Sequence, residues 1–215
     1  MLEISRAKAR QGRPHEKGIT REGIVNAAKE VFSEKGFHYT KMEDIAARAK
    51  CGAGTLYNYF TSKEVLYITV IDESFNNLFT IINSIIMKDA DFTEKLEETA
   101  KVAIGFADNN RSFSKLLFSQ MGYLTSELIG SFADRGQIWF RQFVDLYSKI
   151  MFQGIREGNL RELNPADLAH LFLGIQHQLF NEWLLSPVNY KLESRIPMFL
   201  DLFLYGAGNN ARGGK

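Results

Sequence analysis

The sequence predicts an all-α protein, and three observations lead to that prediction. Only four prolines occur among the 215 residues, and proline is the residue that interrupts a helix most strongly. Apolar residues recur every three or four positions along successive segments, which is the period of one buried helical face. Residues 40–43, T-K-M-E, carry the T-x-x-E pattern of a helix capping box. A chain of this length would hold one large domain or two small ones.

The composition is that of a globular protein with a real core, because 45% of the residues are hydrophobic. The single cysteine, Cys51, excludes an internal disulfide and a zinc site built on cysteines. No apolar run approaches the ~18–20 residues that span a bilayer, and residues 1–18 lack the apolar stretch of a secretory signal. We therefore expect a cytoplasmic protein.

Charge is unevenly distributed along the chain. Residues 1–63 carry 12 Lys and Arg against 7 Asp and Glu, whereas the remaining residues carry 14 against 18, and the overall net charge is +1. A basic first third on an acidic remainder suggests that only the first third meets a polyanion. The alternative is statistical scatter.

The first segments indicate an arm followed by two helices. Residues 1–18 are basic and lack apolar periodicity, so we expect a flexible basic arm. Thr20 can cap a first helix, and Gly36 would end it because glycine takes the left-handed conformation without strain. A second helix would begin with a capping box of Thr40 and Glu43, whose side chains satisfy free backbone donors.

A third helix is expected over residues 53–59, after a short turn. A helix of hardly two turns is too short to be stable alone, but Leu56 and Phe60 lie four positions apart and can anchor it against the first two helices. Ser62 would then cap a long apolar fourth helix over residues 63–86. This order of helix, helix, turn and short helix is the plan of a helix-turn-helix unit.

The outward face of the third helix is polar and aromatic. With Leu56 directed inward, Thr55, Tyr57, Asn58 and Tyr59 spread over the outward and lateral faces, because successive helical residues turn by about 100°. Tyr and Thr hydroxyls bond phosphate oxygens, and Asn can bond adenine edges. This face therefore favours contact with DNA. The alternative is that the two tyrosines only pack against the fourth helix.

Two segments, AAKEVFSEKGFHYTKMEDIAARA and GTLYNYFTSKEVLY, closely resemble the DNA-binding domain of the TetR/AcrR family of one-component transcriptional regulators. The resemblance covers about residues 17–77, and the ordered pattern G-T-L-Y-x-Y-F-x-S-K-E-x-L is specific. It implies a helix-turn-helix DNA-binding domain over residues 19–78. A helical effector-binding and dimerisation domain would follow over residues 79–206, joined through the long fourth helix, and residues 207–215 would form a flexible tail.

The resemblance also implies DNA contacts position by position. Thr40, Lys41 and Lys63 would touch phosphates, the third helix would contact bases and backbone, and the arm would lie along the DNA or enter its minor groove. Ala53 stands where many relatives carry Lys or another polar residue, and Cys51 stands where Val is frequent. The implied DNA-binding residues are Arg10, Arg13, Thr40, Lys41, Ala53, Thr55, Tyr57, Asn58, Tyr59 and Lys63.

The rest of the chain predicts helices near residues 92–108, 111–122, 124–157, 165–186 and 194–206. The last two are the best candidates for a dimer interface, in which two helices per subunit form a four-helix bundle across a two-fold axis. The alternative is that their apolar stripes only close the core of one subunit. The candidate interface residues are Leu168, Leu171, Phe172, Ile175, Leu179, Trp183, Met198, Leu202 and Tyr205.

A small-molecule pocket is expected in the same C-terminal half. Phenylalanine clusters there, and a few polar residues lie on or beside apolar faces, which together describe a typical ligand site. We expect an apolar or aromatic effector, and the alternative for each single aromatic is that it belongs to the plain core, which is the commoner role of such residues. The candidate ligand-binding residues are Phe106, Phe118, Gln120, Phe140, Phe143, Gln176, His177 and Phe180.

Catalytic and cofactor motifs are absent from the sequence. It contains no G-x-S-x-G, H-E-x-x-H, P-loop or G-x-G-x-x-G pattern. His170 and His177 share a helical face but are separated by two turns, or ~10.5 Å, which is too far to ligate one ion. We therefore expect no enzyme activity, no metal and no cofactor.

The sequence thus predicts a homodimeric transcriptional repressor that a small effector releases from a palindromic operator in double-stranded DNA. One alternative is an architectural DNA-binding protein without an effector, which would have no cavity in its C-terminal half. A helical enzyme is a further alternative, but no group of residues in the sequence supports it.

Overall fold

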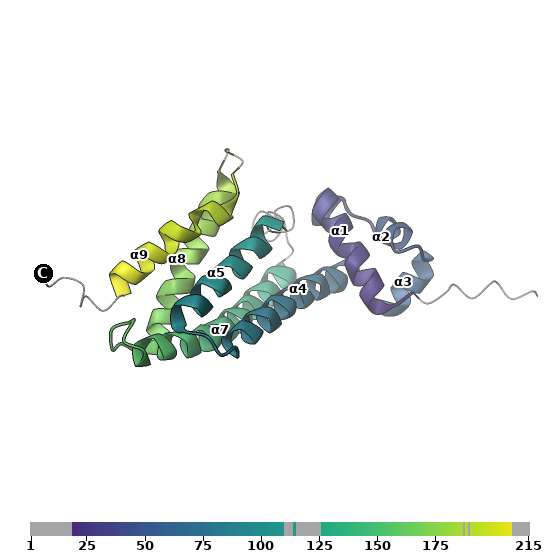
Figure 1. Ribbon diagram of the computed structural model, residues 1–215. Helices are drawn as coiled ribbons and strands as arrows, with labels where there is room; N and C mark the ends of the chain where they lie inside the picture. Colours follow the sequence, from purple (N-terminus) through teal and green to yellow (C-terminus); the bar gives the residue numbers. More distant parts are fainter. Residues whose placement is uncertain (1–18, 110–113, 115–125, 187, 189, 208–215) are drawn as a thin grey trace, which may run out of the picture.

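The computed structural model describes residues 19–109, 114, 126–186, 188 and 190–207, and their secondary structure is helical throughout. Figure 1 shows a small N-terminal unit made of α1, α2 and α3 at one end of the molecule and a larger helical bundle at the other, with α4 running between them. The elements are α1 (Arg21–Tyr39), α2 (Met42–Arg48), α3 (Ala53–Tyr59), α4 (Lys63–Ile86), α5 (Phe92–Asn109), α7 (Ser126–Arg156), α8 (Pro165–Leu185), the 3₁₀ helix η2 (Leu192–Arg195) and α9 (Ile196–Ala207). This arrangement confirms the predicted all-α class, while the helix expected over residues 111–122 lies almost wholly outside the described residues.

The start and the break of α1 follow the sequence signals. The Gly23 amide donates to the Thr20 hydroxyl at 3.0 Å, so Thr20 caps the helix as predicted. Gly36 has φ 79°, a left-handed conformation in which glycine is unstrained, and the helix kinks there. The chain turns helical again as far as Tyr39, and this short extension leads directly to α2.

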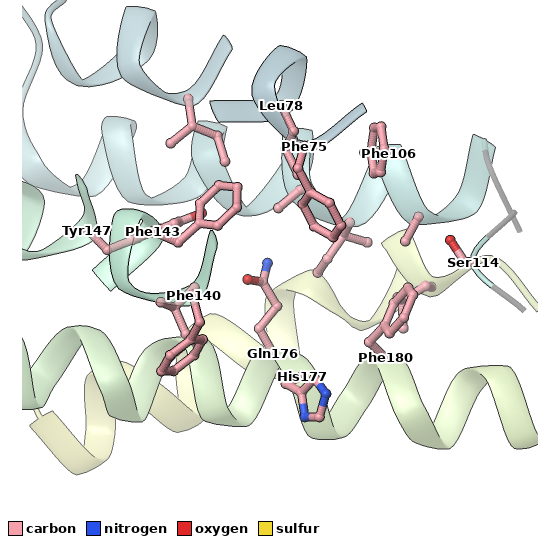
Figure 2. Close-up of a pocket in the computed structure, with 16 residues that line it drawn as sticks. Phe75, Leu78, Phe106, Ser114, Phe140, Phe143, Tyr147, Gln176, His177 and Phe180 are labelled. Atoms are coloured by element: carbon pink, nitrogen blue, oxygen red, sulfur yellow. The ribbon is translucent and has the colours of Figure 1, made fainter. Parts of the chain in front are cut away.

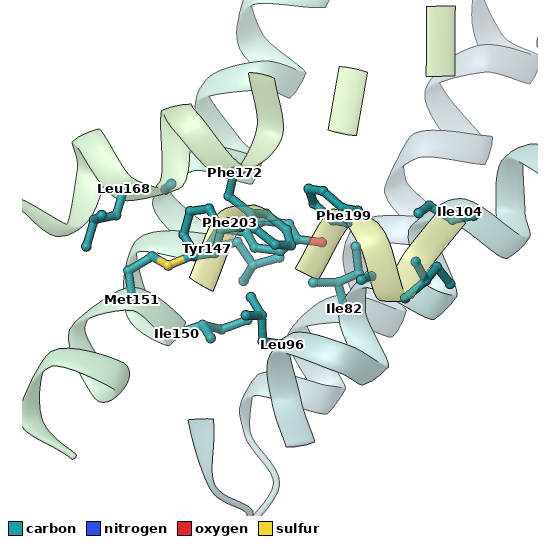
Figure 3. Close-up of a cluster of buried hydrophobic side chains, with 14 of the residues drawn as sticks. Ile82, Leu96, Ile104, Tyr147, Ile150, Met151, Leu168, Phe172, Phe199 and Phe203 are labelled. Carbon is teal, nitrogen blue, oxygen red and sulfur yellow. The ribbon is translucent and has the colours of Figure 1, made fainter. Parts of the chain in front are cut away.

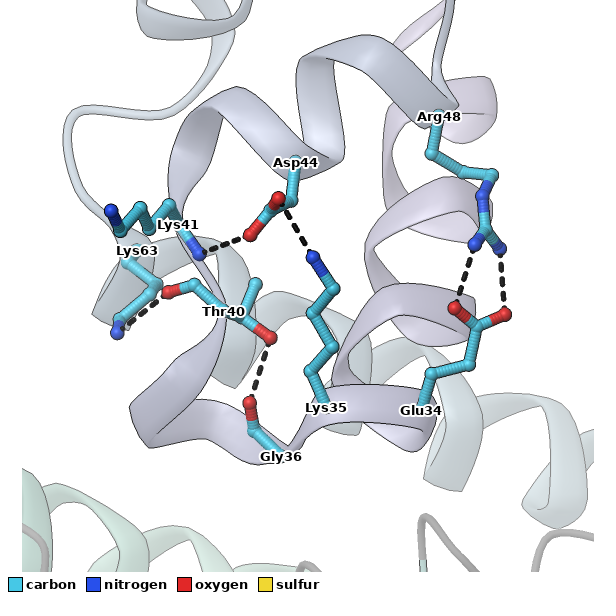
Figure 4. Close-up of polar contacts among 8 residues, drawn as sticks. All are labelled: Glu34, Lys35, Gly36, Thr40, Lys41, Asp44, Arg48 and Lys63. Atoms are coloured by element: carbon cyan, nitrogen blue, oxygen red, sulfur yellow. Dashed lines mark hydrogen bonds and ion pairs between the residues drawn. The ribbon is translucent and has the colours of Figure 1, made fainter.

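The predicted capping box of α2 is wrong by one residue. The Lys41 amide donates to Asp44 Oδ2 at 3.0 Å, so the helix begins after Lys41. The Thr40 side chain is only 1% exposed, and its hydroxyl donates to the Gly36 carbonyl at 2.7 Å (Figure 4). Thr40 therefore satisfies a carbonyl left free by the kink in α1 and has no role at the start of α2.

The turn between α2 and α3 is a left-handed C-terminal cap. Lys50 has φ 56°, and its amide donates to the Ala47 carbonyl while the Cys51 amide donates to the Ala46 carbonyl at 2.9 Å. This pair of bonds is the Schellman motif, which stops a helix and reverses the chain. It places α3 against the first two helices, where Leu56 is fully buried as predicted.

Helix α4 contributes to two separate cores. The residues near its start, such as Leu66 and Val70, pack with α1 to α3, whereas Leu78 and Ile82 pack in the C-terminal bundle. By length and composition α4 is apolar enough to cross a membrane, which corrects the expectation that the chain has no such run. One or two such helices are weak evidence for a span, because the core helix of a globular protein has the same composition.

The C-terminal bundle is closed by aromatic contacts among three helices (Figure 3). The Phe172 ring of α8 lies 5.2 Å from that of Tyr147 on α7 and 4.7 Å from that of Phe199 on α9. Helices α5 and α7 approach closely at Gly154, where an added Cβ would lie 2.6 Å from a ring carbon of Phe92. The bundle thus holds α4, α5, α7, α8 and α9 around one apolar core.

Candidate nucleic-acid interface and ligand pocket

The outward face of α3 carries the side chains that the sequence placed there. Tyr57 is 48% exposed, Tyr59 and Asn58 are also exposed, and Thr55 and Ala53 are half-buried. The opposite face is anchored by Leu56 and the following Phe60 in the N-terminal core. An exposed row of hydroxyl, amide and aromatic groups is therefore held rigidly on a helix of two turns.

The Tyr59 hydroxyl also fixes the entry of the chain into α1. It donates to the Ile19 carbonyl at 3.2 Å, which joins the residue before the Thr20 cap to the end of α3. The predicted arm residues Arg10 and Arg13 lie outside the described residues. The Tyr59 bond holds Ile19, the first of the described residues, against the end of α3.

Lys63 has a different role from the phosphate contact expected of it. Its ammonium donates to the Thr40 carbonyl at 3.0 Å (Figure 4). It also donates to the Phe37 carbonyl at 2.8 Å and lies 4.4 Å from the centre of the Phe37 ring. Burial lowers the pKa of this lysine. Two of its three N–H groups are thus used to fasten the start of α4 to the junction of α1 and α2. Thr40, expected at a phosphate, is likewise buried with its hydroxyl engaged.

Several cations of the helix-turn-helix unit are paired with acids. Arg48 forms a forked pair with Glu34 (Nη2 to Oε2 2.7 Å), and Lys35 contacts Asp44 at 2.8 Å (Figure 4). Hydrogen bonds from Arg48 and Lys35 lower the pKa of Glu34 and of Asp44, respectively. The exposed Lys41 remains at the start of α2. Part of the positive charge of the helix-turn-helix unit therefore forms ion pairs within the unit itself.

A cavity of about 190 Å³ lies in the C-terminal bundle between α4, α5, α7 and α8 (Figure 2). Six of the eight predicted ligand residues line it, namely Phe106, Phe140, Phe143, Gln176, His177 and Phe180. The other two, Phe118 and Gln120, lie outside the described residues.

The cavity also has walls that were not foreseen. Phe75, Leu78 and Ile82 of α4 line it, together with Tyr147 of α7. The three- and four-residue spacing of these α4 positions could have indicated them, but the helix was interpreted only as a connector.

The cavity is apolar apart from a few polar groups. The Gln176 amide points from α8 between the rings of Phe75 and Phe143 (Figure 2). Its Nε2 is buried without a hydrogen bond, as is the Tyr147 hydroxyl. Burial raises the pKa of Tyr147 far above its ordinary value, and the neighbouring Thr99 hydroxyl opposes this shift only in part. These two donors are polar groups in an otherwise apolar wall.

The wall of the cavity touches the N-terminal unit. Phe75 stacks on Trp139 with ring centres 4.5 Å apart, and both rings pack against the core of α1 to α3. On the other side of the wall, the Lys29 ammonium of α1 lies 5.7 Å from the centre of the Phe106 ring. Arg135 of α7 forms an ion pair with Asp72 of α4. Residues that line the cavity are therefore one contact away from the helix-turn-helix unit.

The candidate dimer residues divide into two groups. Leu202 is 58% exposed and Tyr205 79% exposed, and Leu171 and Met198 are exposed with them. Ile175 and Leu179 are half-buried.

Leu168, Phe172 and Trp183, in contrast, are buried in the core of their own subunit, and Trp183 Nε1 donates to the Tyr190 carbonyl at 2.8 Å. Their assignment to a subunit interface is therefore corrected. Apolar residues occur on both faces of α8, so that spacing alone did not separate the inner face from the outer one.

The helix-turn-helix unit matches a known family model. Residues 24–70 match the model described as bacterial regulatory proteins, tetR family. A stretch of 52 residues is 48% identical to the transcriptional regulator UidR of Escherichia coli, and it makes up 24% of this chain and 26% of UidR.

Relatives that match most of the chain are more distant. The fatty acid metabolism regulator protein of Bacillus subtilis is 23% identical over 187 residues, which cover 86% of this chain and 94% of that protein. The structure of the regulator FadR from Bacillus subtilis in complex with stearoyl-CoA superposes with a TM-score of 0.71 at 22% identity, covering 87% of this chain and 99% of that one. The similarity to FadR shows that the whole fold is shared.

Proposed function

Because this chain belongs to the TetR family of bacterial transcriptional regulators, we propose that it is a cytoplasmic repressor that binds a palindromic operator as a homodimer. The observation that carries the proposal is the exposed face of α3, where Tyr57, Asn58 and Tyr59 project from a helix whose other face is buried. Each subunit would insert α3 into the major groove of one half-site. The half-sites would lie about one helical turn, ~34–36 Å, apart or slightly more.

The test of this face is a pair of substitutions at Tyr57. Since its side chain is half exposed and makes no contribution to the core, Tyr57→Ala should leave the melting temperature unchanged. We expect it to weaken operator binding by at least ~1 kcal/mol, because one hydrogen bond of the tyrosine hydroxyl to the DNA contributes about that much. Tyr57→Phe separates loss of the hydroxyl from loss of the ring. Operator affinity equal to that of the wild type in both variants would remove Tyr57 from the interface.

The dimer would form through the exposed apolar residues of α8 and α9. These two helices expose four large apolar side chains to solvent, those of Leu171, Met198, Leu202 and Tyr205. Apolar side chains that gather on a protein surface mark interaction sites. Leu202→Arg should therefore give a monomer by light scattering, while the same change at the exposed Ile81 of α4 leaves the mass unchanged. A dimeric Leu202→Arg protein would refute this interface.

The cavity in the C-terminal bundle would bind the effector. Its apolar walls suit an apolar or aromatic molecule, and a relative whose structure was solved with stearoyl-CoA supports an acyl compound. A ligand that displaced Phe75 or Phe106 would act on Trp139 and Lys29 and so on the position of the helix-turn-helix unit. The two recognition helices of the dimer would then no longer fit both half-sites.

Two alternatives are less well supported. An architectural DNA-binding protein would have no use for a cavity in its C-terminal half, and this chain has one. The relatives are regulators of transcription, not enzymes. If a saturating concentration of effector left the operator affinity unchanged, this would contradict the proposed release mechanism and would favour the architectural alternative.

A further inference from the structure

We propose that the cavity selects ligands that present a hydrogen-bond acceptor, such as the carbonyl oxygen of a ketone, ester or thioester, to the side chains of Gln176 and Tyr147. This inference rests on the proposed effector function and adds the chemical class of the ligand. It is carried by two buried donors that have no partner within the protein and line the same apolar cavity.

The first donor is the Gln176 amide. Nitrogen Nε2 carries two N–H groups, and neither finds an acceptor. The side chain extends from α8 into the space between Phe75 and Phe143, so its amide faces the cavity (Figure 2). A buried donor without an acceptor lowers the stability of the folded protein. A ligand oxygen bound in the cavity would accept a hydrogen bond from Gln176 and remove this cost.

The second donor is the Tyr147 hydroxyl. Tyr147 is buried, with its ring 5.2 Å from that of Phe172 on α8. A tyrosine hydroxyl carries its proton at neutral pH and can donate it, and burial raises the pKa of Tyr147 further in the same direction. The adjacent Thr99 hydroxyl donates to the Leu96 carbonyl at 3.0 Å, and it makes no hydrogen bond of normal geometry with the Tyr147 hydroxyl. Tyr147 thus adds a second neutral donor to the wall.

The neighbouring polar group does not take this role. His177 is exposed, and its Nδ1 lies 3.2 Å from the Asn181 amide nitrogen on the same helix. Figure 2 shows its ring on the side of α8 away from Gln176. No Asp, Glu, Lys or Arg side chain belongs to the lining among the described residues. A neutral acceptor therefore suits this wall better than a carboxylate, which would lose its hydration without gaining a cation.

The experiment compares four probes of similar length: methyl decanoate, the ketone 2-undecanone, the alkane undecane and the free decanoate ion. Binding is followed by tryptophan fluorescence, because Trp139 stacks on the cavity residue Phe75 and Trp183 packs on the cavity residue Phe180. We expect the ester and the ketone to bind about tenfold more tightly than the alkane, since one hydrogen bond to a buried orphan donor is worth about one factor of ten. Decanoate that bound as tightly as its ester would contradict a neutral acceptor.

Gln176→Leu and Tyr147→Phe are the decisive variants. Both keep the approximate shape and remove an orphan donor, so they should hold or raise the melting temperature of the unliganded protein. A structurally bonded polar group would give a lower melting temperature instead. Gln176→Leu should abolish the preference for the ester over the alkane while leaving alkane affinity unchanged. A preference of unchanged size in both variants would overturn the proposal.

The readout on DNA separates this inference from the proposed function. If the ester binds with a preference that depends on Gln176 but leaves operator affinity unchanged, the repressor mechanism fails and the donor pair stands. If the ester releases the operator equally well in wild type and Gln176→Leu, the mechanism stands and the donor pair fails. A matched Gln→Leu substitution at Gln137, which is exposed on α7 and does not line the cavity, should alter neither the preference nor the release.

Discussion

Removing the charge of Lys63 should destabilise the N-terminal unit without altering the number of phosphate contacts. In Lys63→Met the side chain still covers the Phe37 ring, but the two hydrogen bonds to the carbonyls of Phe37 and Thr40, at 2.8 and 3.0 Å, are lost. The cation over the ring at 4.4 Å is lost as well. These carbonyls terminate α1, so no other donor of the helix replaces the ammonium.

The expected magnitude follows from these contacts. Hydrogen bonds to a charged group contribute ~1.5–3 kcal/mol each in favourable cases, and a cation over an aromatic ring contributes ~0.5–1 kcal/mol at a partly exposed site. Desolvation opposes these gains, because burial lowers the pKa of Lys63. The side chain is also not fully buried. We therefore expect the free energy of unfolding to fall by about 2 kcal/mol.

The assay is urea denaturation of Lys63→Met beside Lys41→Met. Lys41 is exposed and its hydrogen bonds in the fold are made by its backbone N–H and C=O groups, so substitution of its side chain should change stability by less than ~0.5 kcal/mol. If Lys41 contacts phosphate, its loss lowers the slope of log affinity against log salt by about one unit, while Lys63→Met leaves the slope unchanged. The opposite pattern, with a stable Lys63→Met protein and a reduced slope, would refute the role assigned to Lys63.

Three further predictions concern the fold. Gly154→Ala should lower the free energy of unfolding by about 1–2 kcal/mol, because the clash of the new methyl group with the Phe92 ring outweighs the gain in helix propensity. The control is Gly136→Ala in the same helix, where no described atom lies within 4 Å of the added Cβ. It should raise the free energy of unfolding by ~0.5–1 kcal/mol in the same urea denaturation series. Lys50→Gly should raise stability by up to ~1 kcal/mol by relieving the left-handed φ of 56°, and a loss would mean that the lysine side chain contributes to the turn. The pKa of Asp44 is lowered, chiefly by the hydrogen bond from Lys35. The stabilisation that this carboxylate gives the folded protein is therefore present above the unfolded pKa of ~3.9 and is lost as pH falls below it. Asp44→Asn should flatten the profile of stability against pH in that acid range, and an unchanged profile would contradict the pairing.

The helix-turn-helix unit could be predicted closely from the sequence because local signals agree there. The cap at Thr20, the left-handed glycine at position 36, the cap at Ser62 and the bounds of α3 are all confirmed. Each depends on residues within one or two turns of one another. The buried Leu56 fixes which side of α3 faces outward.

The errors have a common physical cause. Thr40 and Lys63 were assigned from the surface chemistry of their residue types, but both satisfy carbonyls at the end of α1. Those carbonyls are free because of a kink at Gly36, and a lysine 26 residues from Phe37 reaches one of them only in the folded protein. Interactions of this kind are set by the tertiary structure and leave no local pattern.

The ligand pocket and the subunit surface show the same limit. Phenylalanine content and a few polar residues were enough to find Phe106 and Gln176, which line the cavity. Spacing could not tell the buried Phe172 from the exposed Leu171 on α8, because both faces of this helix carry apolar residues. The wall contributed by α4, including Phe75, depends on how far that helix extends past the N-terminal unit.

The most direct test of a sequence-specific repressor is to incubate the protein with a pool of genomic fragments at near-physiological salt and to sequence the retained DNA. The account predicts recovery of one or a few sites with palindromic half-sites about one helical turn apart, and loss of that enrichment for Tyr57→Ala. Uniform retention of fragments regardless of sequence would contradict it and would favour an architectural DNA-binding protein.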